Sequence, residues 1–127
     1  MQDVQRHFAT IRDGRWGSRQ VHYLKTGRGP AVVMLHQSPK SSRDMLPAML
    51  RWRDHFTLIA PDTPGYGLSD PIGTDCDMED FGGAVVEFLD ALGIERTALY
   101  GFHTGAGMVM EVARQAPERV SAVVSNG

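Results

Sequence analysis

Four short apolar runs, each the length of a β-strand, constrain the fold of this chain more than any other feature. They cover residues 31–35, 56–60, 97–100 and 120–124. A continuous apolar run of this length is typical of a strand buried on both faces of a sheet. Helices are expected between the runs, at residues 41–54, 78–92 and 105–115. This alternation predicts the α/β class, with a mostly parallel twisted sheet and helices on both of its faces.

The N-terminal part of the chain predicts a different element, an antiparallel hairpin. Residues 7–12 and 20–25 alternate apolar and polar side chains, and the turn-rich residues 13–17 lie between them. We expect this hairpin to lie at an edge of the sheet. Trp16, in the turn, is expected either in the core or at the rim of a pocket.

The composition of the chain argues against several classes of function. A net charge of −2 without any block of Lys or Arg gives no basic surface for nucleic acid or anionic lipid. The single cysteine, Cys76, excludes an intramolecular disulfide and fits a reducing compartment. The polar N-terminus is unlike a secretory signal, and no segment approaches the roughly 20 apolar residues of a membrane span. We expect a cytoplasmic protein that acts on a small molecule, with no nucleic-acid or membrane partner.

The motif with the most chemical content is Tyr100-Gly101-Phe102-His103-Thr104-Gly105-Ala106. It follows an apolar run and opens a helix, and its two glycines flank His103 symmetrically. This is the pattern of a nucleophile elbow, where the residue at the apex has a strained backbone and β-carbons at the flanking positions would collide with their neighbours. In the G-x-S-x-G pattern the apex is serine, whereas here it is His103.

Three segments together resemble the α/β-hydrolase superfamily. Residues 35–39 resemble its H-G-x-P oxyanion loop, residues 61–70 its P-D-x-P-G-x-G-x-S-D loop, and residues 101–105 its elbow. The resemblance covers nearly all of the chain and implies an α/β-hydrolase fold truncated after the sixth strand. Residues 1–127 are therefore expected to form a partial domain, without the last strands, the cap, and the catalytic acid and histidine of the family.

The resemblance also implies roles for individual residues. His103 is the expected catalytic residue, and the backbone N–H groups of Ser38 and Thr104 are the expected oxyanion hole, a function that does not depend on their side chains. Candidates for the wall of the substrate pocket are His36, Gln37, Tyr66 and Phe102. Gln37 replaces the glycine of H-G-x-P, so both departures from the family pattern fall at the reacting centre.

Two functions remain open for the elbow. An imidazole can attack a carbonyl carbon or act as a general base on water, which favours an enzyme acting on a small ester-like or related carbonyl substrate without a cofactor. A second possibility for the enzyme is a lyase or oxygenase-like role in which His103 only moves a proton. The alternative is an inactive relative that binds a small hydrophobic ligand or a protein partner in the same cleft. The truncated sheet edge predicts self-association of the isolated chain.

Several other residues have a structural and a functional interpretation. His36, His103 and Asp62 could together bind a metal, although loop bracing by hydrogen bonds is the favoured role for His36 and Asp62. Ser38 could contact substrate through its hydroxyl or satisfy its own loop. The remaining histidines, His7, His22 and His55, are expected at the solvated surface. Five methionines are expected in the core: Met34, Met45, Met49, Met108 and Met110.

Overall fold

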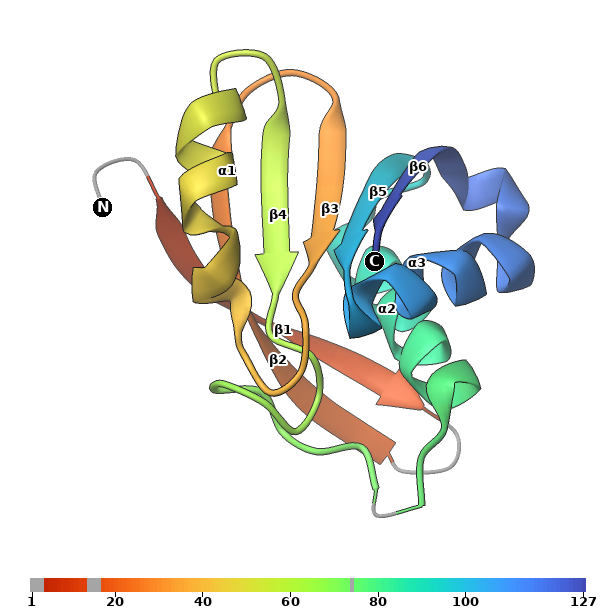
Figure 1. The fold of residues 1–127 in the computed structure, drawn as a ribbon. Coiled ribbons are helices and arrows are strands. Elements are labelled where there is room, and N and C mark those ends of the chain that lie inside the picture. The colour runs from red at the N-terminus through yellow and green to blue at the C-terminus, as the bar shows by residue number, and fades with distance from the viewer. Residues whose placement is uncertain (1–3, 14–16, 74) are drawn as a thin grey trace.

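A computed structural model of the chain describes residues 4–13, 17–73 and 75–127. Over these residues six strands form one sheet in the order β1-β2-β4-β3-β5-β6 (Figure 1). The strands are β1 (Gln5–Asp13), β2 (Gly17–Gly27), β3 (Ala31–Leu35), β4 (Thr57–Pro61), β5 (Thr97–Phe102) and β6 (Val120–Asn126). β3, β4, β5 and β6 pair in parallel, while β1 pairs with β2 and β2 with β4 in antiparallel register. The predicted α/β sheet and its N-terminal hairpin are both present.

The hairpin is longer than its sequence pattern indicated, because β2 also pairs with β4 and so continues to Gly27. Its first strand is an edge strand, as expected, but its second strand belongs to the body of the sheet. The predicted turn and Trp16 involve residues 14–16, which lie outside the described residues.

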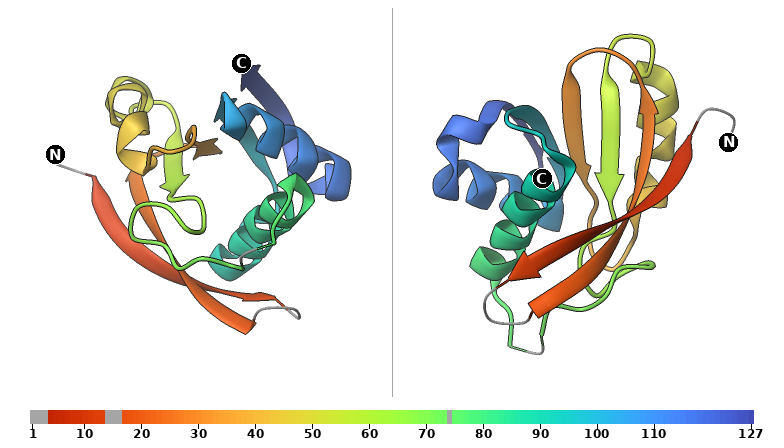
Figure 2. Two further views of the ribbon diagram at one scale, coloured as in Figure 1. Left: turned by 60° about the horizontal axis from the view of Figure 1, so that its bottom comes forward. Right: turned by 180° about the vertical axis from the view of Figure 1, so that it is seen from behind.

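Helices cover the two faces of the sheet unequally. The 3-10 turn η1 (Ser42–Met45) and the short helix α1 (Leu46–Trp52) lie on one face, and α2 (Met78–Leu92) and α3 (Thr104–Gln115) lie on the other (Figure 2). A second 3-10 turn, η2 (Pro117–Arg119), leads into β6. The single helix expected over 41–54 is therefore wrong in its extent. Pro47 sits in the first turn of α1, where its missing N–H costs nothing, so the α-helix begins next to it.

Each face of the sheet has its own apolar core, because successive side chains of a strand point to opposite faces. Val33 and Leu35 pack on the side of α2 and α3, together with Phe88. Met34 points to the opposite side and packs with Met45 and Met49 beneath η1 and α1. Burial of each such side chain contributes about 1.5–3 kcal/mol.

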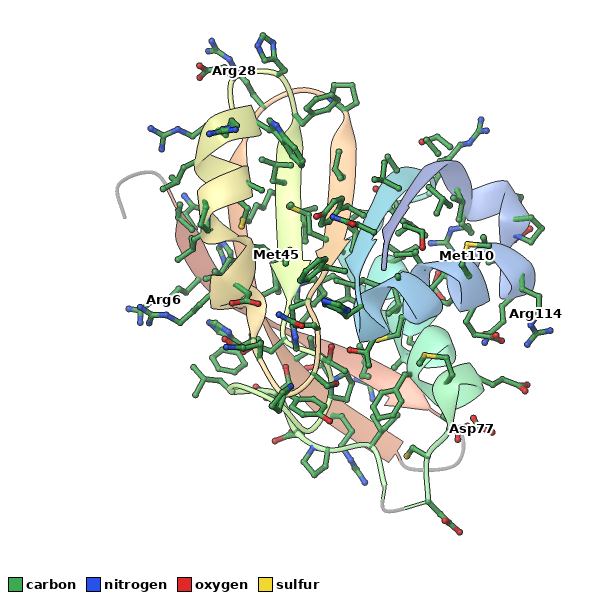
Figure 3. The ribbon with its side chains drawn as sticks, viewed as in Figure 1. Arg6, Arg28, Met45, Asp77, Met110 and Arg114 are labelled. Carbon is green, nitrogen blue, oxygen red and sulfur yellow. The ribbon has the colours of Figure 1, made fainter. Side chains whose placement is uncertain are left out.

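Four of the five methionines expected in the core are buried, and one is not. Met110 lies on the outer side of α3 with 56% of its surface exposed (Figure 3).

α2 is capped at its N-terminus by Asp77, whose side chain accepts a hydrogen bond from the Asp80 N–H while the Asp80 side chain accepts one from the Asp77 N–H. It ends at Gly93, which adopts the left-handed conformation with φ 68°. No helix formed by the described residues is long and apolar enough to cross a membrane.

Candidate active site

The elbow between β5 and α3 holds His103 in an unusual backbone conformation. His103 has φ 55° and ψ −113°, and it is the only non-glycine residue with a positive φ in the part of the chain that the structure describes. Its N–H donates to the Asn126 carbonyl oxygen at 3.0 Å, and its carbonyl oxygen accepts from the Ala106 N–H at 2.9 Å. The backbone is thus fixed on both sides, and the residue at the apex is exposed.

The two glycines of the motif allow this conformation for steric reasons. A β-carbon on Gly101 would overlap with the backbone of Gly105, at the start of α3. A β-carbon on Gly105 would overlap with the carbonyl oxygen of Leu35, at the end of β3. Glycine is therefore required at both positions if β3, β5 and α3 are to approach this closely.

The two residues expected to form the oxyanion hole lie next to each other, although they are far apart in the sequence. The Ser38 N–H donates a hydrogen bond of 2.7 Å to the Thr104 hydroxyl oxygen. Thr104 is the first residue of α3, where a backbone N–H has no acceptor within the helix. No pattern in the sequence indicates that the Thr104 hydroxyl accepts the hydrogen bond of the Ser38 N–H.

The other candidates for the pocket wall are distributed around the elbow. Phe102 is half-buried, and its ring lies 4.2 Å from the His103 ring, centre to centre. It also borders a hollow of about 260 Å³ next to η1 and α1. Tyr66 is half-buried, and its ring lies nearly perpendicular to the His36 ring, with 6.2 Å between the two ring centres. The half-buried Gln37 lies with its amide nitrogen 3.4 Å from an Asp44 carboxylate oxygen.

His36 lies inside the protein and braces two loops. It is 1% exposed, and its Nε2 accepts a hydrogen bond from the Thr63 N–H at 2.9 Å. Its Nδ1 lies 2.7 Å from the Gln37 carbonyl oxygen, which can only accept. The two contacts require the neutral tautomer with the proton on Nδ1. Both nitrogens are therefore engaged by backbone, which favours the bracing role of His36 over contact with a substrate.

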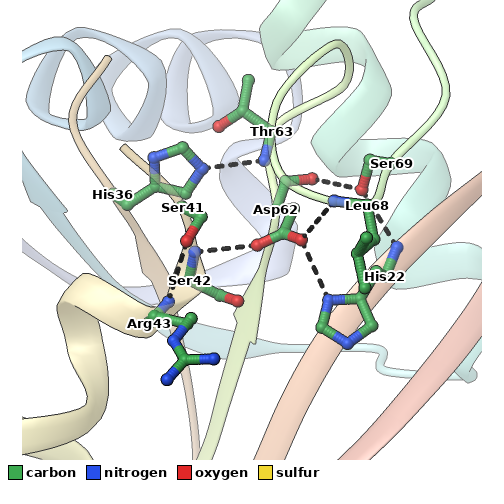
Figure 4. A network of polar contacts seen from close by, with 9 residues as sticks. All are labelled: His22, His36, Ser41, Ser42, Arg43, Asp62, Thr63, Leu68 and Ser69. Atoms are coloured by element: carbon green, nitrogen blue, oxygen red, sulfur yellow. Dashed lines mark hydrogen bonds and ion pairs between the residues drawn. The ribbon is translucent and has the colours of Figure 1, made fainter. Parts of the chain in front are cut away.

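Asp62 is the centre of the buried polar network in Figure 4. Its carboxylate accepts hydrogen bonds from the N–H groups of Ser42 (2.8 Å) and Leu68 (2.9 Å), and from Nδ1 of His22 (2.9 Å). Burial alone would raise the pKa of the Asp62 carboxyl, but the hydrogen bonds from Leu68, Ser42 and His22 outweigh it and hold this pKa below its ordinary value. The network joins β2 to the loops that follow β3 and β4.

His22 was expected at the solvated surface, and this prediction is wrong. The side chain is only 5% exposed and lies against Asp62. The period-two pattern of β2 suggested one polar face, but residues 21–24 are buried on both faces. The available signal was Leu24, an apolar residue on the same face as His22, which indicated that this face was covered as well.

No group of three or more His, Cys, Asp or Glu side chains in the described residues is placed to hold a metal ion. The nitrogens of His36 and the carboxylate oxygens of Asp62 are already engaged by hydrogen-bond donors and acceptors of the chain itself. Their arrangement therefore favours bracing of the loops.

Comparisons with known proteins agree with this architecture. A family model described as alpha/beta hydrolase fold matches residues 30–127. Haloalkane dehalogenase 2 of Mycobacterium tuberculosis is 35% identical over 119 residues, which are 88% of this chain and 41% of that protein. Bifunctional epoxide hydrolase 2 of Mus musculus is 34% identical over 97% of this chain and 22% of that protein.

The same similarity is found in three dimensions. The crystal structure of wild-type Cfl2 from Burkholderia cenocepacia superposes with a TM-score of 0.86 at 28% identity, over 95% of this chain and 40% of that one. The chain thus spans about two fifths or less of the length of these proteins. From the family model, the relatives and the elbow geometry, we conclude that the chain belongs to the α/β-hydrolase fold family.

Proposed function

We propose that the protein is an α/β-hydrolase-type enzyme that acts on a small ester-like or related carbonyl substrate, with His103 as the reacting residue. The observation that carries this proposal is the exposed imidazole on an elbow whose backbone is fixed by hydrogen bonds and by two obligatory glycines. A protein keeps a strained backbone where the surrounding structure enforces it, and such residues cluster at functional sites.

Two routes to hydrolysis are open to His103. As a nucleophile, its unprotonated nitrogen attacks the carbonyl carbon, the alcohol leaves with a proton, and water then cleaves the acyl-imidazole to release the acid. As a general base, it takes a proton from a water molecule that attacks the same carbon. In both routes negative charge develops on the carbonyl oxygen, and we propose that the backbone N–H groups of Ser38 and Thr104 stabilise this charge. Loss of one such donor costs about 10²–10³ in kcat in other enzymes.

The Thr104 hydroxyl has to leave the Ser38 N–H before that donor can bind a substrate oxygen, because the two are hydrogen-bonded at 2.7 Å. Rotation about the Cα–Cβ bond of threonine is sufficient for this step. We therefore propose that Thr104 covers the oxyanion hole until a substrate replaces its hydroxyl.

The hydrogen bond between the Ser38 N–H and the Thr104 hydroxyl also favours a second candidate function. The protein would then bind a small hydrophobic ligand or a protein partner without turnover. The Ser38 donor is filled, and no described residue makes a hydrogen bond to the His103 imidazole, so this part of the chain holds no carboxylate that orients the ring. In an active hydrolase that carboxylate would come from beyond residue 127.

The test uses the full-length protein and a panel of short p-nitrophenyl esters, extended by a haloalkane and an epoxide because two relatives bear the names of enzymes for these substrates. We expect turnover of at least one ester by the native protein and its loss in His103→Ala. A silent native protein in which His103→Ser gains esterase activity would instead support the binding function.

We further propose that residues 1–127 form part of a larger hydrolase domain. Among the strands of the described residues, β6 pairs only with β5, and most of its residues are exposed, including Val124 at 55%. We expect the isolated segment to self-associate in sedimentation velocity experiments. A monomeric segment that melts cooperatively would contradict this proposal.

A further inference from the structure

The imidazole of His103 lies against an aromatic ring, that of Phe102. The two ring centres are 4.2 Å apart, and the ring planes are tilted by 62°. In the part of the chain that the structure describes, this is the ring contact of His103, and no hydrogen bond holds the imidazole. Tilted ring pairs attract each other because the positive edge of one ring faces the negative face of the other. Phe102 is therefore the described side chain that can fix the orientation of the imidazole.

The contact is a consequence of the elbow. In a regular strand, consecutive side chains point to opposite faces of the sheet. Phe102 is the last residue of β5, and it borders the same hollow beside α1 as Tyr100, two residues earlier. His103 departs from the strand with φ 55°, and in this conformation its ring meets that of Phe102. The strained backbone and the ring contact thus belong to one arrangement.

Phe102 is itself held in place by its neighbours. Its backbone is paired with Asn126 of β6, and its ring is half-buried beside Met45 and Tyr100 in the wall of the hollow. The Tyr100 ring lies in turn 6.0 Å from the Trp52 ring of α1, centre to centre. A side chain on a packed strand holds a reacting group more precisely than a side chain on a loop.

A phenyl ring can hold the imidazole without engaging its basic nitrogen. It has no N–H or O–H group to donate, so the nitrogen keeps the lone pair that attacks a carbonyl carbon or takes a proton from water. An exposed imidazole without this contact would be distributed over several staggered rotamers. Only the fraction in the reactive orientation would then contribute to the rate.

We propose that Phe102 is a positioning residue that holds the imidazole of His103 in its reactive orientation. This inference rests on the function proposed for the elbow and adds a residue to it. The attraction within a tilted ring pair corresponds to a factor of about two to ten in population. The role differs from that of a pocket wall, because a wall acts on substrate binding whereas a positioning residue acts on the reaction step.

The first experiment measures p-nitrophenyl acetate hydrolysis by the full-length protein. For Phe102→Leu we expect kcat to fall by about three- to tenfold, with KM changed by less than about twofold. Phe102→Tyr keeps the ring and should retain a kcat close to that of the native protein.

The matched control is Phe56→Leu. Phe56 is 38% exposed and precedes β4, at the end of the parallel strands opposite to the elbow. This variant should retain the native kcat and KM. Thermal melting establishes that all variants are folded.

The second experiment follows the ring protons of His103 by NMR and does not depend on turnover. Their signals are assigned by their loss in His103→Ala. Protons this close to a phenyl ring are displaced by its ring current, so we expect Phe102→Leu to move them toward the positions of a histidine in an unfolded chain. Phe102→Tyr should leave them near their native positions.

The outcomes separate this inference from the proposed function. An active native protein in which Phe102→Leu retains kcat, or in which Phe102→Tyr loses as much as Phe102→Leu, overturns the positioning role alone. A rise in KM at unchanged kcat overturns it in favour of a pocket wall. A silent native protein overturns the function proposed for the elbow, and unchanged His103 signals in Phe102→Leu would then show that Phe102 does not hold the ring either.

Discussion

His103 and His22 occupy opposite situations within one sheet. His103 stands exposed on a strained backbone, and no described residue makes a hydrogen bond to its ring. His22 lies buried on a regular strand, with its ring fixed by Asp62. The backbone strain at His103 has to be compensated by the elements around it, whereas the contacts of His22 stabilise the fold. The two side chains are chemically the same, so the difference lies in their surroundings. Hydrogen bonding to Asp62 fixes His22 in a structural role, whereas the described residues leave the ring nitrogens of His103 free for the reaction that we propose.

The largest expected effect concerns the steric support of the elbow. In the full-length protein, Gly105→Ala places a β-carbon against the Leu35 carbonyl oxygen, and we expect a loss of about 3–5 kcal/mol in the free energy of unfolding, measured in urea. The matched control is Gly83→Ala in α2, where a β-carbon would meet only Gln115 Oε1 at 3.6 Å. Since alanine favours a helix over glycine, the control should be neutral or more stable by about 0.5–1 kcal/mol. Equal effects of the two variants would refute the steric account.

The second largest expected effect concerns the buried hydrogen-bond network around Asp62. Asp62→Asn keeps the shape of the side chain but removes the charge that three donors share, and we expect a loss of about 2–4 kcal/mol at neutral pH. Because the folded pKa of Asp62 is lowered, its contribution is present above the ordinary value of 3.8 and is lost as the pH falls through the folded value.

The stability difference between native protein and Asp62→Asn should therefore shrink below about pH 4, the ordinary range of the aspartate pKa. Urea titrations at several pH values measure it, with the exposed Asp54→Asn as the control. A difference that stays constant down to pH 2 would contradict the role of the charge.

A smaller pair of effects, of opposite sign, compares the two histidines directly. His22→Ala removes a partner of Asp62 and should lower the free energy of unfolding by about 1–3 kcal/mol. His103→Gly relieves the positive φ and should raise it by about 1 kcal/mol. Thermal and urea unfolding measure both. If both variants lose stability to the same extent, the contrast between the two sites is wrong.

The smallest effect concerns the covered oxyanion hole. Thr104→Val retains the shape of the residue and removes the hydroxyl that accepts the Ser38 N–H, at a cost of about 0.5–1.5 kcal/mol. If the hydroxyl competes with substrate, this variant should show a lower KM for p-nitrophenyl acetate than the native enzyme. A higher KM with unchanged stability would show that the hydroxyl assists substrate binding.

Elements that are determined by neighbouring residues in the sequence could be predicted from the sequence alone. The apolar run 31–35 and the helix 78–92, with Gly93 at its end, coincide with β3 and α2. The elbow glycines were also identified, because the steric conflict they avoid lies within one short strand-turn-helix unit and its neighbouring strand.

Features that depend on distant parts of the chain were missed. His22 is buried because η1 and the loop after β4 cover its face of β2, and in the local pattern only one apolar residue of that face, Leu24, indicated this cover. The contact of Ser38 with Thr104 joins residues 66 positions apart, and no local pattern encodes the rotamer that makes it. The single helix expected over 41–54 failed because the effect of Pro47 depends on the turn in which it falls.

The central claim is that the exposed histidine at the elbow carries out the chemistry. Its most direct test is the rate of p-nitrophenyl acetate hydrolysis by the full-length protein, compared with His103→Ala and with His55→Ala, a variant at another exposed histidine. We expect His103→Ala to lose at least about 100-fold in kcat/KM, the range of general acid–base catalysis, while His55→Ala retains the native rate. A native rate that persists in His103→Ala would contradict the claim.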